Sequence, residues 1–187
     1  MTGFLIAVLI LVIICALYFI GVYNRLVGLR NNVQASWKQI DVQLQKRYDL
    51  VPNLVETVKG YAAHEKDTLE RVIQARNMAM DASGTADQAQ AENMLTGALK
   101  SIFALSEAYP DLKANQNFLM LQQELSSIEN KIAYSRQHFN DTVRNYNTLQ
   151  QQFPANMVAG MAGCKIEEYF EIEEPEARQA VKVDFSS

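Results

Sequence analysis

The sequence predicts an all-α protein: a single N-terminal transmembrane helix continues into an antiparallel up-down-up-down helical bundle with two long and two shorter helices. Three observations lead to this prediction. The first 24 residues carry no charged side chain, apolar residues then recur every three or four positions, and no run between residues 24 and 153 alternates as a strand would. We expect residues 1–24 to form the anchor, 25–153 the bundle, and 154–187 a Gly/Met-containing segment with an acidic tail.

Residues 3–23 are apolar except for two glycines. At about 1.5 Å per residue, a helix of this length matches a hydrocarbon core of roughly 30 Å. A cleavable signal peptide would need a basic start, a shorter apolar core and small residues at the cut, whereas bulky Tyr23 and Leu26 stand here. We therefore expect a retained span. The residues that mark it are Gly3, Phe4, Leu5, Ile6, Tyr18, Phe19, Ile20 and Tyr23.

Basic residues follow the span, and only the terminal amine precedes it. Arg25, Arg30 and Lys38 lie within about 15 residues of its end, the distance over which positive charge sets orientation. The positive-inside rule therefore favours an outside N-terminus with a cytoplasmic domain. Because the excess of positive charge is modest, the opposite orientation stays open.

The first amphipathic stretch runs from Leu26 to Ala62, with apolar residues at a mean spacing of 3.6 residues. This is the period of one face of an α-helix. Pro52 lies inside the stretch and removes one backbone hydrogen bond, so we expect a bend there. Because the apolar stripe keeps its phase across Pro52, we expect one bent helix rather than two.

Two shorter helices and a second long helix follow. Asp67 is the predicted N-cap of the second helix, and Thr85 with Gln88 has the spacing of a capping box for the third. Pro110 should end the third helix, and the fourth should begin near Asn115. Since the long helices must project beyond the short ones, we expect an uncovered apolar stripe that would receive a partner helix or a second copy.

The alternation of helix directions returns the chain towards the membrane after residue 153. The apolar, Gly-rich segment 157–163 has Met157, Val158 and Met161 as candidate membrane-surface residues. The alternative is that this segment packs across the end of the bundle as a cap. The acidic tail beyond it is expected to be solvated, although the alternation over residues 180–185 would also suit an edge strand added to a partner.

No motif in the sequence predicts catalysis, a metal or a cofactor. The net charge of −4 excludes a strongly basic nucleic-acid binder, and two distant cysteines exclude a disulfide scaffold. Phosphate-binding glycine loops and nucleophile elbows are missing from the sequence. His64 and Glu65 resemble the start of a zinc-protease helix, but Thr68 stands where the second histidine should be.

One polar constellation stands at the predicted bend: Arg47, Tyr48, Asp49, Pro52 and Asn53. A proline bend can expose backbone carbonyls and orient polar groups around a ligand or partner. The alternative is a tertiary brace, in which these groups hydrogen-bond the neighbouring helix. We favour the brace and keep the constellation as a candidate structural or interaction motif.

Longer sequence segments carry a family resemblance. They are YNRLV at 23–27, WKQIDVQL at 37–44, RYDLVPNLV at 47–55, VKGY at 58–61, YPDLKAN at 109–115, ENKIAYSR at 129–136, FND at 139–141 and EYF at 168–170. Over essentially its whole length the chain resembles the LemA family of bacterial membrane proteins. The resemblance implies an N-terminal anchor and an antiparallel helical bundle, and it brings no catalytic residues or cofactor. Ser36 departs from the alanine that usually precedes the first tryptophan.

The sequence therefore predicts a non-enzymatic, single-pass protein of the bacterial inner membrane whose bundle mediates self-assembly or scaffolding. Its expected partners are the lipid bilayer, further copies of itself as a homo-oligomer, and other membrane proteins, with no nucleic acid and no cofactor. The alternative is a ligand-sensing or signalling adaptor. In that case the bend at Pro52 would move on binding and the acidic tail would recruit a partner.

Overall fold

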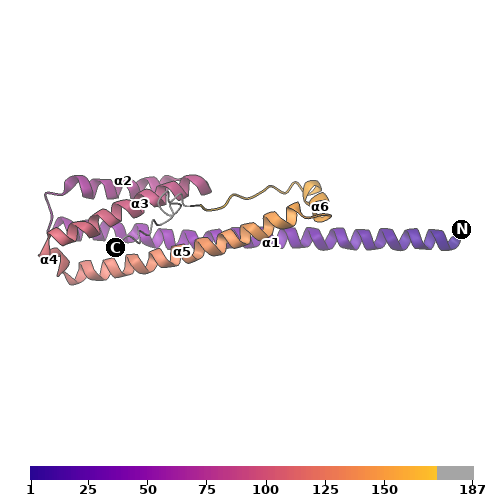
Figure 1. The fold of residues 1–187 in the computed structure, drawn as a ribbon, viewed down its shortest axis with the longest axis horizontal. Helices are drawn as coiled ribbons and strands as arrows, with labels where there is room; N and C mark the ends of the chain where they lie inside the picture. Colours follow the sequence, from indigo (N-terminus) through magenta and orange to yellow (C-terminus); the bar gives the residue numbers. More distant parts are fainter. Residues whose placement is uncertain (172–187) are drawn as a thin grey trace, which may run out of the picture. The chain divides into compact units, whose positions relative to one another are not determined.

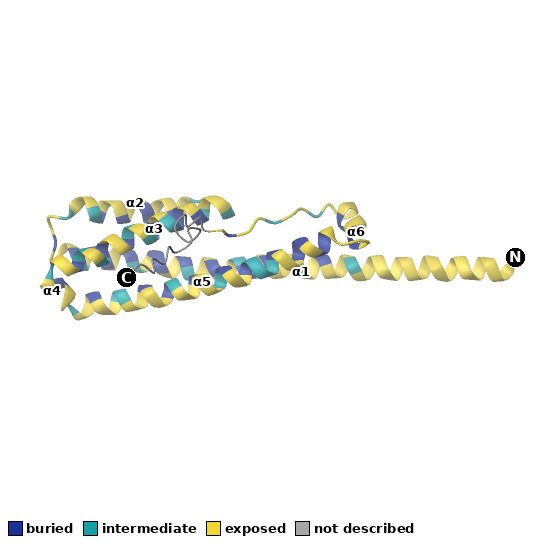
Figure 2. Ribbon diagram, in the orientation of Figure 1, coloured by how far each residue is buried: buried dark blue, intermediate teal, exposed yellow. Residues whose placement is uncertain are grey.

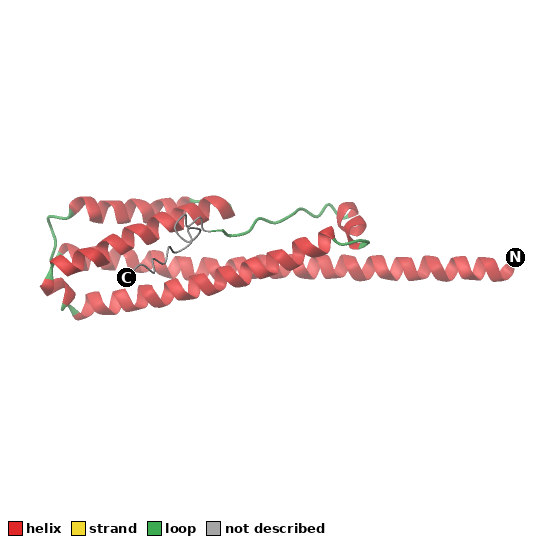
Figure 3. Ribbon diagram, viewed as in Figure 1, coloured by secondary structure: helices red, strands yellow, loops and turns green. Residues whose placement is uncertain are grey.

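A computed structural model describes residues 1–171, so the expectations for the tail beyond them, including segment 180–185, lie outside the described residues. The described residues form helices and no strand, which confirms the all-α prediction (Figure 3). The helices are α1 (Thr2–Lys59), α2 (Lys66–Asp81), α3 (Thr85–Leu105), α4 (Pro110–Lys113), α5 (Gln116–Gln151) and α6 (Ala155–Met161), with a 3-10 turn, η1, at Ser106–Ala108. Two are long and two are shorter, as predicted for the bundle.

The chain divides into two compact units. Unit 1 comprises Met1–Leu50 and Met120–Tyr169, so it pairs the first part of α1 with most of α5 and includes α6. Unit 2 comprises Val51–Leu119 with Phe170 and Glu171 among the described residues, so it holds the end of α1, the α2–α3 hairpin, α4 and the start of α5. In unit 1, α1 and α5 run in opposite directions, and in unit 2, α2 and α3 do (Figure 1).

α1 is one helix of 58 residues that contains both the predicted span and the first amphipathic stretch. Every residue from Met1 to Gly21 is exposed, and Leu26 is the first buried side chain (Figure 2). Among the described residues, α1 alone is long and apolar enough to cross a membrane. Pro52 lies inside the helix without dividing it, which confirms the prediction of one helix.

The apolar stripes of α1 and α5 bury each other in unit 1. Ile40 and Leu44 of α1 are 0% and 2% exposed, and Ile132 and Val143 of α5 are both 0% exposed. No stripe residue of α1 between Leu26 and Tyr48 is exposed. The predicted uncovered stripe on the long helices is therefore wrong for this unit, because the second long helix supplies the cover.

Two helix starts in unit 2 differ from the sequence predictions. α2 has Glu65 at its N-cap position, while Asp67 lies in the first turn. α3 has Gly84 at its N-cap with φ 87°, a left-handed conformation that glycine adopts readily, and this N-cap makes no side-chain cap hydrogen bond. Since Thr85 is already helical there, it cannot cap the helix, and the predicted capping box with Gln88 is wrong.

The chain between α3 and α5 forms two short helical segments, η1 and α4, where the sequence predicts only a break. α3 ends at Leu105, and Pro110 begins α4 instead of only ending α3. Proline suits a first helical position because its missing N–H would have no intrahelical partner there. Asn115 precedes α5, and its Oδ1 accepts a hydrogen bond from the Phe118 N–H at 2.9 Å, which confirms the predicted start of that helix.

Candidate functional site

Arg47 is the member of the polar constellation that reaches α5. It is 1% exposed, and its Nη2 lies 3.0 Å from Oε2 of Glu129, a half-exposed carboxylate. A guanidinium keeps its charge at every physiological pH, so its burial requires a counter-charge of this kind. Tyr48 beside it is 5% exposed and belongs to the core. For Arg47 the brace interpretation therefore describes the structure.

The other members of the constellation make local contacts on exposed positions. Asp49 Oδ1 accepts a hydrogen bond from Gln45 Nε2 at 2.8 Å, and the Asn53 carbonyl accepts one from Thr57 Oγ1 at 2.8 Å. Both bonds stay within α1. Pro52 is exposed as well. The moving bend of the adaptor hypothesis stays a prediction.

Two further contacts align α1 with α5 in unit 1. The Oγ of Ser36 and the Oγ1 of Thr142 lie 2.9 Å apart, and the ring of Trp37 meets that of Phe139 edge-on with centroids 5.3 Å apart. Edge-on aromatic pairs add stability beyond the area that they bury. Trp37 therefore packs between α1 and α5. These residues fix the register of the two helices.

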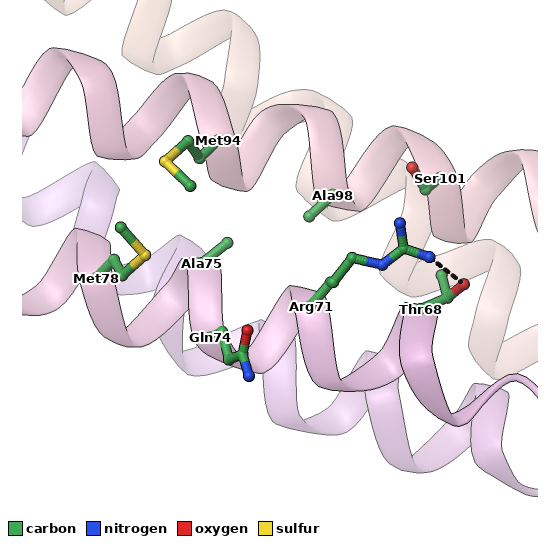
Figure 4. A pocket seen from close by; sticks show the side chains of 8 residues that line it. All are labelled: Thr68, Arg71, Gln74, Ala75, Met78, Met94, Ala98 and Ser101. Carbon is green, nitrogen blue, oxygen red and sulfur yellow. Dashed lines mark hydrogen bonds between the residues drawn. The ribbon is translucent and has the colours of Figure 1, made fainter.

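A groove of about 310 Å³ lies between α2 and α3 in unit 2 (Figure 4). Two methionines face each other at one end, Met78 at 50% and Met94 at 46% exposure. Ala75 and Ala98 leave the middle hollow, and Arg71 extends at the other end towards Thr68, Ser101 lying opposite. Its lining residues are Thr68, Arg71, Gln74, Ala75, Met78, Met94, Ala98 and Ser101.

Sequence reasoning missed this groove because its methionines lie off the buried stripes. The signal that could have indicated it is a small residue on each of two facing helices, flanked by long flexible apolar side chains. Methionine adapts to irregular partners and is common on binding surfaces. The α2–α3 groove is therefore an apolar surface suited to a protein partner.

Gln88 ties the two helices of the groove together at the end away from α4. Its Nε2 donates to the Ala79 carbonyl at 3.0 Å and to Oε1 of Glu92 at 3.1 Å. Glu92 is 0% exposed. Because a buried carboxylate requires hydrogen bonds, this arrangement gives Gln88 a tertiary role instead of the predicted cap.

At the opposite end of unit 2, two tyrosines hydrogen-bond the loop after α1 to the segment that precedes α5. Tyr109 Oη donates to Oε1 of Glu65 at 3.1 Å, and Asn115 Nδ2 donates to Oη of Tyr61 at 2.8 Å. The hydrogen bond to Glu65, followed by burial, raises the pKa of Tyr109 above its usual 10.0. His64 is exposed in the loop beside this contact. Within the described residues, no group of three or more His, Cys, Asp or Glu side chains could hold a metal.

Most of the apolar, Gly-rich segment 157–163 belongs to the short helix α6 in unit 1. Ala155, Val158 and Ala159 are buried on one face, while Met157 and Met161 are 56% and 81% exposed on the other. Val158 therefore differs from its predicted place, because it packs inward instead of facing a membrane surface. Contact of the exposed Met157 and Met161 with lipid stays a prediction.

Comparison with known proteins identifies relatives over most of the chain. The model of the LemA family matches residues 36–185. The chain is 27% identical over 150 residues to Protein LemA of Metamycoplasma hominis, with 78% of this chain and 64% of that protein covered. It is 26% identical over 174 residues to the magnetosome protein MamQ of Magnetospirillum gryphiswaldense, with 79% and 64% covered. The chain thus spans 64% of the length of these relatives.

Proposed function

The chain belongs to the LemA family, and we propose that it is a non-enzymatic, single-pass inner-membrane protein whose helical bundle self-assembles as a scaffold. The long apolar helix α1 supports the membrane location. The names of these relatives describe no enzymatic activity. The observation that carries the assembly step is the α2–α3 groove, because its exposed methionines are an apolar surface outside the membrane span.

The occupant that we propose for the groove is the same groove of a second copy. The groove offers both protruding parts, Met78 and Met94, and a hollow over Ala75 and Ala98. A surface that carries both can be self-complementary, as a two-fold symmetric contact requires. Because Met78 and Met94 are each about half buried already, burying the rest of each side chain would contribute roughly 1 kcal/mol. Anchoring in one membrane raises the local concentration of copies and so lowers the affinity that the contact needs.

The test measures the mass of the assemblies that the full chain forms in nanodiscs, for the wild type and for a variant with charged residues in the groove. We expect the wild type to form dimers or larger assemblies, and the variant Met78→Glu/Met94→Glu to be monomeric. The matched control is Met80→Glu, since Met80 is 46% exposed on the same helix but does not line the groove. A monomeric wild type, or a groove variant that assembles like the control, would overturn the proposal.

Cross-linking identifies which occupant fills the groove. In a background with Cys15→Ala and Cys164→Ser, a cysteine at Met78 should form a disulfide with its counterpart in a second copy. A cysteine at Met80 should do so far less. Cross-linking of the Met78→Cys variant only to a different protein would contradict self-assembly and would indicate a heterologous partner.

For orientation we propose that the domain after the span lies in the cytoplasm. Arg25 and Arg30 are exposed directly after the span, the place where positive charge has most effect. The reporter is Ser83→Cys in the exposed turn between α2 and α3, within the same cysteine-replaced background. We expect a membrane-impermeant maleimide to label it only after permeabilisation. Labelling in intact spheroplasts would place the domain outside.

A further inference from the structure

The register of α1 and α5 determines which part of α1 lies beside the end of α5. Ser36 meets Thr142 and Arg47 meets Glu129, so 11 residues back along α1 correspond to 13 residues forward along α5. Gln151, the last residue of α5, lies nine residues beyond Thr142 and is therefore about level with residues 27–28 of α1. This is where buried residues of α1 begin and where the fully exposed span ends.

α6 follows directly beyond this point. Figure 1 shows it past the end of α5, on the side of the N-terminus. Since residues 3–23 have the length of a hydrocarbon core, α6 stands at the level where lipid headgroups would surround α1.

α6 is held in a fixed orientation by contacts on both sides. Its inner face, Ala155, Val158 and Ala159, is buried. The chain after it returns along α5, where Asn147 exchanges two hydrogen bonds with the backbone of Glu167, at 2.8 and 3.0 Å. The outer face of α6 therefore points away from the packed helices as a consequence of the fold.

The outer side of α6 presents large apolar side chains beside the exposed Asn156. Phe153 before the helix and Met161 at its end are each 81% exposed, and Met157 between them is 56% exposed. Tyr23 is exposed at the end of the span, where tyrosines are enriched at membrane interfaces. Arg25 and Lys165 are exposed in the same unit and carry the charge that anionic headgroups attract.

We propose that Phe153, Met157 and Met161 form a second membrane contact, which lies in the headgroup region of the bilayer that α1 spans. The occupant is lipid because the patch lies level with the end of the span (Figure 1), at the depth where short apolar segments with neighbouring basic residues partition. The contact is separate from the α2–α3 groove. Its consequence is that unit 1 is tied to the membrane at two points and is restricted in tilt and rotation about α1.

The experiment places a bimane fluorophore on the full chain in nanodiscs of phosphatidylcholine and phosphatidylglycerol. Single cysteines at Phe153, Met157 and Met161 are made in the background with Cys15→Ala and Cys164→Ser. The control is Tyr134→Cys, since Tyr134 is 75% exposed on α5 at a position far along the helix pair from α6. Circular dichroism checks that each variant keeps the helical content of the parent.

We expect headgroup-region nitroxide lipids to quench the probe at Met161 and Phe153 by about twofold, and aqueous iodide to quench it weakly. The probe at Tyr134 should show the reverse. A probe at Met161 that behaves like the one at Tyr134 would overturn the proposal. The proposal would also be overturned if the probe at Met161 were protected from iodide only in nanodiscs that hold several copies. In that case a second protein chain, and not lipid, would cover the patch.

Assembly through the α2–α3 groove and lipid contact at α6 can fail independently of each other. The variant Met78→Glu/Met94→Glu should retain lipid quenching at Met161, whether or not it assembles. If quenching disappeared with assembly, the patch would be an interface between copies and the lipid contact would be refuted.

Discussion

Arg47 carries a permanent charge into the seam between α1 and α5, and Glu129 supplies the neighbouring carboxylate. Removing that carboxylate leaves the buried guanidinium without this counter-charge. We expect Glu129→Gln to lower the free energy of unfolding by about 1–2 kcal/mol, less than for a fully buried pair, because water still reaches Glu129. Urea unfolding followed by circular dichroism in detergent measures the change.

An exposed ion pair gives the matched control for Glu129. Lys59 and Glu56 lie 3.4 Å apart with both side chains well exposed, so Glu56→Gln should change stability by less than about 0.5 kcal/mol. Adding Arg47→Met to Glu129→Gln should recover part of the loss, since the buried charge is then absent. Equal losses for the two glutamine variants would contradict the assignment of Arg47 and Glu129 as a brace.

Because of Tyr146, we expect the free energy of unfolding of unit 1 to fall at alkaline pH. Burial, followed by its hydrogen bond with Cys164, raises the pKa of Tyr146 from 10.0 to about 12. The folded state thus holds the phenolic proton more tightly than the unfolded state, so this stabilisation is complete below pH 10 and is lost as the pH rises through 12. We expect the unfolding free energy of the wild type to fall more steeply over this range than that of Tyr146→Phe. Parallel curves would refute the shift.

At the scale of elements, periodicity predicted the long helices because each buries one continuous stripe. Val33 and Ile40 of α1, and Ile128 and Ile132 of α5, are buried where a 3.6-residue period places them. Helix starts were harder to predict because several polar residues can serve as caps. At α3 the N-cap is Gly84, whose φ of 87° is a conformation that glycine adopts readily and that a capping-box pattern does not indicate.

The candidate sites were less predictable than the helices. Met78 and Met94 form one groove only because α2 and α3 adopt a particular register, which single-helix patterns do not contain. Segment 157–163 was identified as apolar, but its separation into a buried Val158 and an exposed Met161 follows from the turn after α5. The pattern at the bend indicates a brace for Arg47, but it does not identify the partner, because Glu129 lies 82 residues away in the sequence.

Asn115 fixes the start of α5 through two hydrogen bonds. Its Oδ1 accepts from the Phe118 N–H, and its Nδ2 donates to the hydroxyl of Tyr61. Because an N-cap satisfies a backbone donor that has no helical partner, we expect Asn115→Ala to cost about 1–2 kcal/mol in thermal unfolding. Asn117→Ala, at an exposed position in the first turn, is the control and should cost much less. Equal effects would show that Asn115 does not act as a cap.

At the scale of the whole molecule, the charge distribution along α1 should set the orientation of the protein. The variant Thr2→Lys/Gly3→Lys/Arg25→Gln/Arg30→Gln moves positive charge from one side of the span to the other. Since positive charge near a span is retained in the cytoplasm, we expect labelling of the Ser83→Cys reporter in intact spheroplasts to rise from near background to most of the protein. Lys46→Gln removes a charge farther along α1 and should leave labelling unchanged. An unaltered orientation in the fourfold variant would show that these charges do not orient the chain.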